Sequence, residues 1–230
     1  MKKNAICIIP AKKVSKRIPN KNIKLFFGKP IIGHVIKNIK KSGCFDEIFV
    51  STDSLKIKKI SEKYGAKVPF LRNKKLSDEH SKTIDVLIDS INKLRKNYKF
   101  NIVCCIYPTS IFATSHIIKK AFRFLKSKKI KFVFSAKKYE HPIQRAFFIK
   151  KNKINLISNK NFFKRTQDFL DTYYDAGQIY LSHYKNFINK KNQFNLPSKA
   201  IIFKKFESID IDTKESFLNA KKIFNKKLYL

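Results

Sequence analysis

The sequence predicts an α/β fold built on an open, mostly parallel sheet with helices on both faces. Short, continuously apolar segments alternate along the chain with longer segments whose apolar residues recur at helical spacing. Strands without polar alternation are buried on both faces, which is typical of parallel sheets between two helical layers. The chain of 230 residues is 43% hydrophobic, so residues 1–230 are expected to form a single domain with a sizeable core.

The elements of the first half follow from these two patterns. In chain order they are a strand at 5–10 (AICIIP), a helix at 30–43, a strand at 47–52 (EIFVST), a helix at 54–65, a helix at about 82–97, a strand at 102–107 (IVCCIY), a helix at about 115–127 and a strand at 132–136 (FVFSA). Gly43 and Gly65 mark helix ends, since glycine readily takes the left-handed conformation that closes a helix. Ligands of such sheets bind beyond the carboxyl ends of the strands, so the segment after residue 10 is a candidate site.

The alternation stops after residue 137. Residues 139–175 are rich in polar and aromatic side chains and show no helix–strand repeat, so we expect an inserted arm that contains a hairpin. Residues 178–183 (QIYLSH) and 201–206 (IIFKKF) predict two further strands, and residues 212–224 predict the last helix.

The net charge of +36 raises the question of a nucleic-acid partner. Lysine supplies nearly all of the 52 cations, and the lysines are spread along the whole chain rather than gathered in one tail. Abundant Lys, Asn, Ile and Phe with few glycines is the composition that an AT-rich genome gives to any protein. We therefore expect a solvated basic surface that attracts polyanions weakly and in a salt-dependent way, with no specific nucleic-acid partner.

The cell compartment is predicted from what the chain lacks. Residues 1–13 have too short an apolar stretch for a signal peptide and no small-residue cleavage site, and no apolar run has the length of a membrane span. The four cysteines show neither zinc spacing nor a disulfide pattern. These observations predict a cytoplasmic protein with no membrane partner.

A basic segment follows the first strand. Residues 8–22 read IIPAKKVSKRIPNKN, and the cations Lys12, Lys13, Lys16, Arg17 and Lys21 are not balanced there by a carboxylate. Lysines and exposed backbone N–H groups at the end of a strand form an anion site. The alternative is a loop that is basic only because the whole chain is rich in lysine.

Asp210 and Asp212 are separated by one residue, so in an extended segment their side chains share a face. Two carboxylates this close together bind a hard cation well. The alternative for Asp212 is a helix N-cap with Glu215 as its capping-box partner, which leaves Asp210 unexplained.

Separated segments across nearly the whole chain resemble the CMP-sugar cytidylyltransferases, the enzymes that activate acidic sugars. These segments are the opening loop, FFGKPIIGHVI (26–36), DEIFVSTD (46–53), VPFLRNKKLSD (68–78) and SIDIDT (208–213). CCIYPTS (104–110), FVFSAKKYEHPIQRAF (132–147), RTQD (165–168) and YDAGQIY (174–180) look most similar to the members that act on pseudaminic acid.

The resemblance implies a Rossmann-like nucleotidyltransferase in which the anomeric hydroxyl of a nine-carbon acidic sugar attacks the α-phosphorus of CTP and pyrophosphate leaves. Pseudaminic acid is the sugar it implies first. Sialic, legionaminic and 3-deoxy-octulosonic acid are alternatives, and so is a weakly active or inactive relative that binds polyanions. The resemblance also implies a homodimer, because in the family the region equivalent to residues 139–175 is a dimerisation and sugar-binding arm that crosses to the partner subunit.

The resemblance also assigns roles to single residues. Lys16, Lys21 and Asp212 are the expected catalytic residues, and Lys12, Ser15, Asn22, Arg72 and Thr83 are the expected nucleotide contacts. Asp210 and Asp212 are expected to hold Mg²⁺, and Gln144, Arg145, Arg165, Gln167 and Gln178 are expected to bind the sugar. Arginine suits the sugar's carboxylate because its planar guanidinium binds both oxygens. The alternative for the two arginines is a structural ion pair with Glu140 or Asp168.

The opening loop departs from the family pattern. Where the family generally has Arg-Gly-Gly, this chain has Lys12, Lys13 and Val14. Glycine permits positive φ and a close approach of the backbone to phosphate, and valine disfavours that conformation. We therefore expect either compensation by the charge of Lys13 or reduced activity.

Overall fold

A six-stranded sheet forms the centre of the protein. The computed structural model describes residues 3–78, 80–189, 193–204 and 208–228. Its strands are β1 (Ala5–Pro10), β2 (Leu25–Phe26), β3 (Lys29–Pro30), β4 (Glu47–Ser51), β5 (Ile102–Ile106), β6 (Phe132–Lys138), β7 (Phe147–Lys150), β8 (Lys153–Leu156), β9 (Tyr173–His183) and β10 (Ser198–Phe203). The central sheet has the order β10-β6-β9-β5-β1-β4, in which β9 runs antiparallel to β5 and β6 and the other neighbours are parallel. The predicted open, mostly parallel sheet is confirmed.

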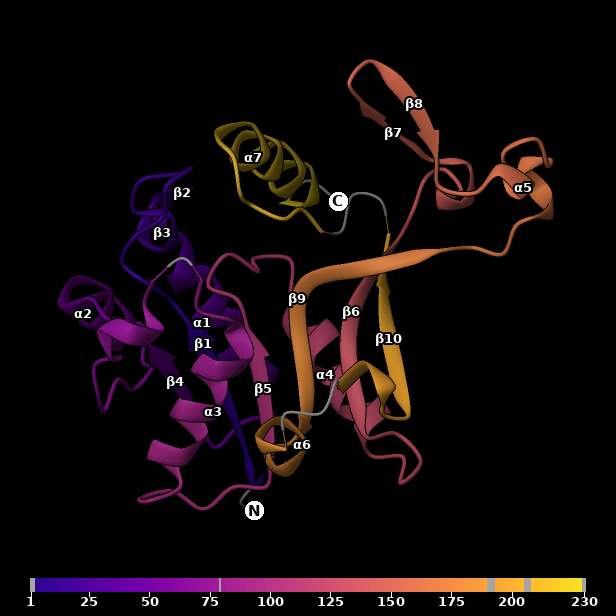
Figure 1. Ribbon diagram of the computed structural model, residues 1–230. Coiled ribbons are helices and arrows are strands. Elements are labelled where there is room, and N and C mark those ends of the chain that lie inside the picture. Colours follow the sequence, from indigo (N-terminus) through magenta and orange to yellow (C-terminus); the bar gives the residue numbers. More distant parts are fainter. Residues whose placement is uncertain (1–2, 79, 190–192, 205–207, 229–230) are drawn as a thin grey trace.

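Helices lie on both faces of this sheet (Figure 1). They are α1 (Ile31–Ser42), α2 (Leu55–Lys63), α3 (Thr83–Leu94), α4 (Ser115–Leu125), α5 (Asn159–Phe162), α6 (Tyr184–Ile188) and α7 (Lys214–Leu228). Among the helices within the described ranges, none combines the length and the apolar character that a membrane span requires.

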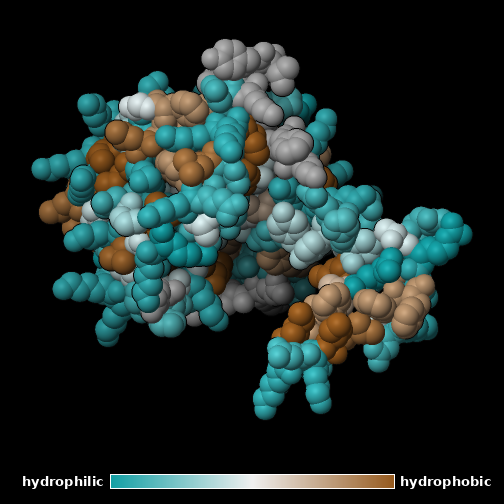
Figure 2. Space-filling model, turned by 90° about the horizontal axis from the view of Figure 1, so that it is seen from above, coloured by the Kyte–Doolittle hydropathy of each residue, from teal (hydrophilic) through white to brown (hydrophobic). Residues whose placement is uncertain are grey.

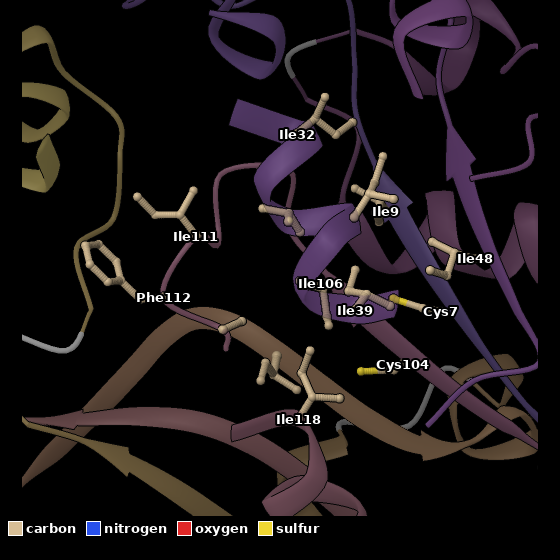
Figure 3. Close-up of a cluster of buried hydrophobic side chains, with 14 of the residues drawn as sticks. Cys7, Ile9, Ile32, Ile39, Ile48, Cys104, Ile106, Ile111, Phe112 and Ile118 are labelled. Carbon is tan, nitrogen blue, oxygen red and sulfur yellow. The ribbon is translucent and has the colours of Figure 1, made fainter. Parts of the chain in front are cut away.

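The side chains of β1 alternate between two cores. Cys7 and Ile9 enter the cluster that α1 and α4 cover, where Figure 3 shows Ile39 and Ile118 among the neighbouring side chains. Ile8 enters the opposite cluster, which α3 and α6 cover. Both faces of the strand are therefore buried, which is the reason for its uninterrupted apolar sequence.

The boundaries of most predicted elements agree with the structure to within a few residues. Gly43 follows α1 with a φ of 63°, and the Oγ of Ser54 caps α2 by accepting the N–H of Ile57 at 3.3 Å. Part of the strand predicted at 201–206 lies outside the described residues. The sequence did not predict the short β2–β3 hairpin, whose turn places Phe27 at a φ of 44°.

Residues 139–172 leave the central sheet between β6 and β9 and form an arm, which projects from the body of the molecule (Figures 1 and 2). The arm holds the predicted hairpin, in which β7 and β8 pair antiparallel and Ile149 lies opposite Ile154. Figure 2 shows apolar surface gathered on this lobe. Ile149 and Ile154 are 68% and 65% exposed, so the arm does not serve the core of its own chain.

Candidate active site

Two adjoining pockets lie where the basic loop leaves the carboxyl end of β1. The loop pocket is lined by Lys12, Val14, Ser15, Lys16, Arg17, Lys21, Asn22, Ser77, Asp78 and His80. The sheet pocket, of about 300 Å³, shares Lys12, Lys21, Asn22 and Asp78 with it and adds Pro10, Arg72, Leu76, Ser81, Thr83, Val86, Tyr107, Pro108, Thr109, Asp210 and Asp212. All the predicted nucleotide, catalytic and metal residues therefore line one of two connected pockets, which stand at the sheet edge where α/β folds bind ligands.

Hydrogen bonds to its backbone fix the start of the basic loop. The buried Asn22 side chain donates to the carbonyl oxygen of Lys12 at 2.9 Å, and the N–H of Lys13 donates to Asp53 Oδ1 at 2.7 Å. The N–H of Lys13 is thus already paired and is not presented to a ligand. Side chains rather than this backbone group are left to meet an anion.

The residues that replace the family's two glycines, Lys13 and Val14, have no strained backbone conformation. In the described chain, the positive φ angles outside glycine are at Asn4, Asn20, Phe27, Lys151 and Asn152. Lys13 and Val14 are not among them, and the side chain of Val14 is 60% exposed. The loop thus adopts a conformation that needs no glycine at positions 13 and 14.

Asp212 lies between two cations of the loop. Its Oδ1 accepts from Lys21 Nζ at 2.8 Å, and its Oδ2 accepts from Arg17 at 2.5 Å. Partial burial acts to raise the pKa of Asp212, but the hydrogen bonds and positive charges of Lys21 and Arg17 outweigh it and lower the pKa. The carboxylate is therefore held ionised at neutral pH.

The alternative that Asp212 caps the last helix is wrong. The cap of α7 is Thr213, whose Oγ1 accepts the N–H of Ser216 at 3.1 Å. Ser216 Oγ in turn accepts the N–H groups of Asp212 and Thr213 at 2.9 Å each. This reciprocal pair supplies hydrogen-bond acceptors to the backbone N–H groups at the start of the helix. The Asp212 carboxylate is therefore left to face the pocket and its cations.

Asp210 shares the sheet pocket with Asp212. Partial burial and the negative charge of Asp212 raise the pKa of Asp210, and Lys21 and Arg17 oppose that rise. Mutual repulsion of this kind is what a divalent cation relieves. The described residues hold no group of three or more His, Cys, Asp or Glu arranged for a metal, and the role of Asp210 and Asp212 in holding Mg²⁺ stays a prediction.

Arg72 and Thr83 line the sheet pocket. The buried guanidinium of Arg72 donates to the Oγ and carbonyl oxygen of Ser51 and, at 3.4 Å, to the carbonyl oxygen of Leu76. Burial lowers the pKa of Arg72. These bonds tie the segment at 72–76 to the end of β4, so Arg72 shapes the pocket as well as lining it.

Sequence reasoning did not assign a site role to Tyr107, although it lines the sheet pocket at the end of β5. Its hydroxyl donates to Thr83 Oγ1 at 3.1 Å. Burial and the neighbouring Cys105 raise the pKa of Tyr107 to about 12, so the phenol stays protonated. The signal in the sequence that could have indicated a site role for Tyr107 is its position as an aromatic residue at the end of an apolar strand segment.

The predicted sugar residues are not brought to these pockets within one chain. Arg145 donates to Thr166 Oγ1 at 3.2 Å, and Arg165 lies against Gln167, all within the arm. Gln144 belongs to the same arm. Gln178 is 2% exposed in β9, and its amide donates to the carbonyl oxygen of Ala176 at 3.3 Å. Their role in sugar binding stays a prediction.

Comparisons with known proteins point to one family of enzymes. The profile of the cytidylyltransferase family matches residues 6–229. A pseudaminic acid cytidylyltransferase of Campylobacter jejuni is 37% identical over 221 residues, covering 95% of each chain. A CMP-N,N'-diacetyllegionaminic acid synthase of Legionella pneumophila is 33% identical over 219 residues, covering 90% of each. The structure of a CMP:2-keto-3-deoxy-manno-octonic acid synthetase complexed with CTP has a similar fold, with a TM-score of 0.71 and 14% identity over 97% of this chain and 99% of that one.

Proposed function

Because this chain belongs to the cytidylyltransferase family, we propose that it transfers CMP from CTP to pseudaminic acid and releases pyrophosphate. The observation that carries this proposal is the 37% identity to a pseudaminic acid cytidylyltransferase over 95% of both chains. The arrangement of cations and carboxylates around the loop and sheet pockets supports it. In the reaction, the anomeric oxygen of the sugar bonds to the α-phosphorus, and the bond from that phosphorus to the β-phosphate bridge breaks.

The cations of the loop meet the chemical demands of this transfer. Nucleotidyl transfer depends on positioning and charge neutralisation more than on covalent help from the protein. Lys12, Lys16 and Lys21 line the loop pocket and would neutralise the triphosphate. Ser15 and Asn22 add neutral hydrogen-bonding groups beside them.

Asp210 and Asp212 are the residues that fit Mg²⁺. Both line the sheet pocket, and each is close enough to the other for Asp212 to raise the pKa of Asp210. A bound Mg²⁺ would stabilise charge on the leaving pyrophosphate or on the attacking sugar hydroxyl. Arg17 and Lys21 contribute by keeping Asp212 ionised. Mg²⁺ commonly takes few protein carboxylates and completes its shell with phosphate oxygens and water, which suits a pair.

We propose that the arm packs against a second copy of the chain. The arm exposes large apolar side chains, namely Phe147 (48%), Ile149 (68%), Ile154 (65%), Phe163 (87%) and Leu170 (88%). Monomeric soluble proteins rarely expose contiguous apolar surface of this kind. Arg145 and Arg165 lie on the same arm, away from the pockets of their own chain. A homodimer in which the arm reaches the partner's pocket accounts for both features.

A pyrophosphate-release assay tests the proposed function. CTP, UTP, ATP and GTP are each paired with pseudaminic, legionaminic, sialic and 3-deoxy-octulosonic acid, with Mg²⁺ or excess EDTA. We expect release with CTP and pseudaminic acid, at least about tenfold slower release with other nucleotides, and loss of activity in EDTA. Equal turnover with ATP, or full activity in EDTA, contradicts the proposal.

The second candidate is a CMP-legionaminic or CMP-sialic acid synthetase, which the 33% identity to the Legionella pneumophila relative supports. The same assay separates it, because legionaminic or sialic acid would then release pyrophosphate faster than pseudaminic acid. A weakly active or inactive relative that binds polyanions is the third. It would release little or no pyrophosphate with any pair and would bind nucleic acid with a steep dependence on salt.

A further inference from the structure

The peptide group between Lys12 and Lys13 is held from both sides by side chains. Its carbonyl oxygen, which belongs to Lys12, accepts a hydrogen bond from the side-chain amide of Asn22 at 2.9 Å. Its N–H, which belongs to Lys13, donates to Asp53 Oδ1 at 2.7 Å. The C=O and N–H of a trans peptide group point in opposite directions, so Asn22 and Asp53 hold one planar unit at its two ends. We call these two side chains the peptide clamp.

The chemistry of the peptide clamp permits one orientation of this peptide group. A carboxylate accepts hydrogen bonds and has no proton to donate, whereas the nitrogen of a side-chain amide donates. If the peptide group turned over, its carbonyl oxygen would face the Asp53 carboxylate, and its N–H would face the donating nitrogen of Asn22. Acceptor would then meet acceptor, and donor would meet donor. The clamp therefore fixes the direction in which the chain leaves Lys12 and enters the basic loop.

Asp53 is itself held in place by its neighbours in the chain. It lies between the end of β4 at Ser51 and Ser54, whose Oγ caps α2 by accepting the N–H of Ile57 at 3.3 Å. The carbonyl oxygen of Ser51 also accepts the N–H of Ala11 at 2.9 Å. The end of β4 thus holds the start of the basic loop at two successive places, first through its backbone and then through the Asp53 side chain.

The peptide clamp affects residues of the loop pocket. Ser15 and Lys16 line that pocket and follow the clamped peptide group in the chain. Within the described chain, Asp53 is not among the residues that line either pocket. A ligand of the loop pocket would therefore meet side chains whose placement depends on Asp53 without touching Asp53 itself.

We propose that Asp53 is a positioning residue for the triphosphate of CTP, acting on Lys16 through the peptide group between Lys12 and Lys13. The inference rests on the proposed function, which gives the cations of the loop to the triphosphate, and extends it to a residue outside both pockets. In this arrangement the N–H of Lys13 supports the loop, and the contacts with phosphate come from side chains. The two side chains of the clamp order a loop that has no glycine at positions 13 and 14.

The test measures the Kd of CTP by calorimetry, with Mg²⁺ and without sugar, and the melting temperature of Asp53→Ala and Asp53→Asn. Asp53→Ala removes the acceptor of the Lys13 N–H, and we expect the Kd of CTP to rise at least about fivefold. Asp53→Asn keeps a carbonyl oxygen that can accept this N–H, so its Kd is expected to stay within about twofold of the parent. Rescue by asparagine distinguishes the hydrogen bond from the negative charge of the residue.

Asp89→Ala is the matched control for the loss of charge. Burial lowers the pKa of Arg72, and the negative charges of Asp53 and Asp89 both oppose that lowering. Both alanine variants therefore remove a charge that acts on Arg72. Asp89 lies on α3, where its carboxylate pairs with Lys93 Nζ at 2.8 Å instead of with the loop. The Kd of CTP in Asp89→Ala is expected to stay within about twofold of the parent.

A double-mutant cycle tests the path from Asp53 to Lys16. Lys16→Ala is expected to raise the Kd of CTP at least about tenfold in the parent and in the Asp89→Ala background. In the Asp53→Ala background we expect a rise of less than about threefold, because Lys16 is no longer held where it meets the triphosphate. If the effects of Asp53→Ala and Lys16→Ala simply multiply, Asp53 does not act on Lys16 and the inference is overturned.

The remaining outcomes separate this inference from the proposed function. The inference is overturned if Asp53→Ala lowers the melting temperature and leaves the Kd of CTP unchanged, or if Asp53→Asn binds CTP as weakly as Asp53→Ala. A parent protein that binds CTP but transfers CMP to none of the four sugars overturns only the proposed function, because the affinity measurement needs no sugar. A parent protein that does not bind CTP overturns both.

Discussion

Lys21 Nζ lies 2.8 Å from Asp212 Oδ1, so a cation expected to face the triphosphate and a carboxylate expected to hold a metal are paired with each other. Arg17 makes a second contact with the same carboxylate. Both loop cations are thereby aimed at the pocket before substrates bind. A triphosphate would compete with Asp212 for these cations and would leave its carboxylate free, so binding exchanges ion pairs instead of creating buried unpaired charge.

We predict that Asp212→Asn and Asp210→Asn lower kcat severely while costing little stability. Asp212 makes partly exposed ion pairs and caps no helix, and such pairs contribute about 0–1 kcal/mol. The kinetic loss follows because both carboxylates belong to the proposed magnesium pair. Pyrophosphate release and thermal unfolding, measured on the same samples, check the two parts.

Thr213→Ala is the matched control for these variants. Thr213 supplies the cap of α7, so its loss is expected to cost about 1 kcal/mol of stability and to leave kcat near that of the parent. If Asp212→Asn instead lowers only the melting temperature, or Thr213→Ala abolishes turnover, the division between chemistry and capping is wrong.

The arm yields a prediction about assembly. Ile149 and Ile154 lie opposite each other in the β7–β8 hairpin and are largely exposed. We expect light scattering to report a dimer at micromolar concentration, and the double change of Ile149 and Ile154 to aspartate to produce monomers with reduced sugar turnover. Leu55→Asp, at a residue that is 62% exposed on α2, is the control and should remain dimeric. An active monomeric parent would refute the assembly.

Replacing Lys13 and Val14 together by glycine is predicted to keep activity within about threefold of the parent. Neither residue has positive φ, and the N–H of Lys13 is already bound to Asp53. Glycine therefore brings no new phosphate contact in this conformation, while each substitution costs roughly 0.5–1 kcal/mol of backbone order. A fall in melting temperature without a gain in kcat/KM is the expected result. A large gain would mean that the loop rearranges around CTP.

The sequence predicted the central elements because their signals are local. Apolar runs and helical spacing determined β1, α1 and β5, and glycine marked the end of α1. The β2–β3 hairpin was missed because each strand has two residues and its turn uses Phe27 at positive φ in place of asparagine. The capping alternative failed because Thr213, next to Asp212, caps as well as aspartate does.

The site was only partly predictable, because some of its residues form local patterns in the sequence and others meet only through the fold. Lysines at a strand end and an Asp-x-Asp pattern can be read from the chain, and the structure brings them to the same pockets. Tyr107 follows β5 and Tyr180 lies in β9, and the centroids of their rings are 5.8 Å apart. The two strands are paired in space but distant in sequence, so no local pattern in the sequence encodes this contact.

Lys16→Ala provides the sharpest test of the loop. The side chain lines the loop pocket, and a charge-assisted contact to a triphosphate is worth about 1.5–3 kcal/mol. We therefore expect kcat/KM for CTP to fall at least about tenfold. Lys13→Ala is the matched control, because Lys13 is an exposed lysine of the same loop that lines neither pocket. Both changes remove one positive charge, so any general effect of net charge is shared and only the specific contact differs. If Lys16→Ala is harmless and Lys13→Ala is inactive, the triphosphate lies against the other side of the loop, and the roles assigned to Lys16 and Lys21 are wrong.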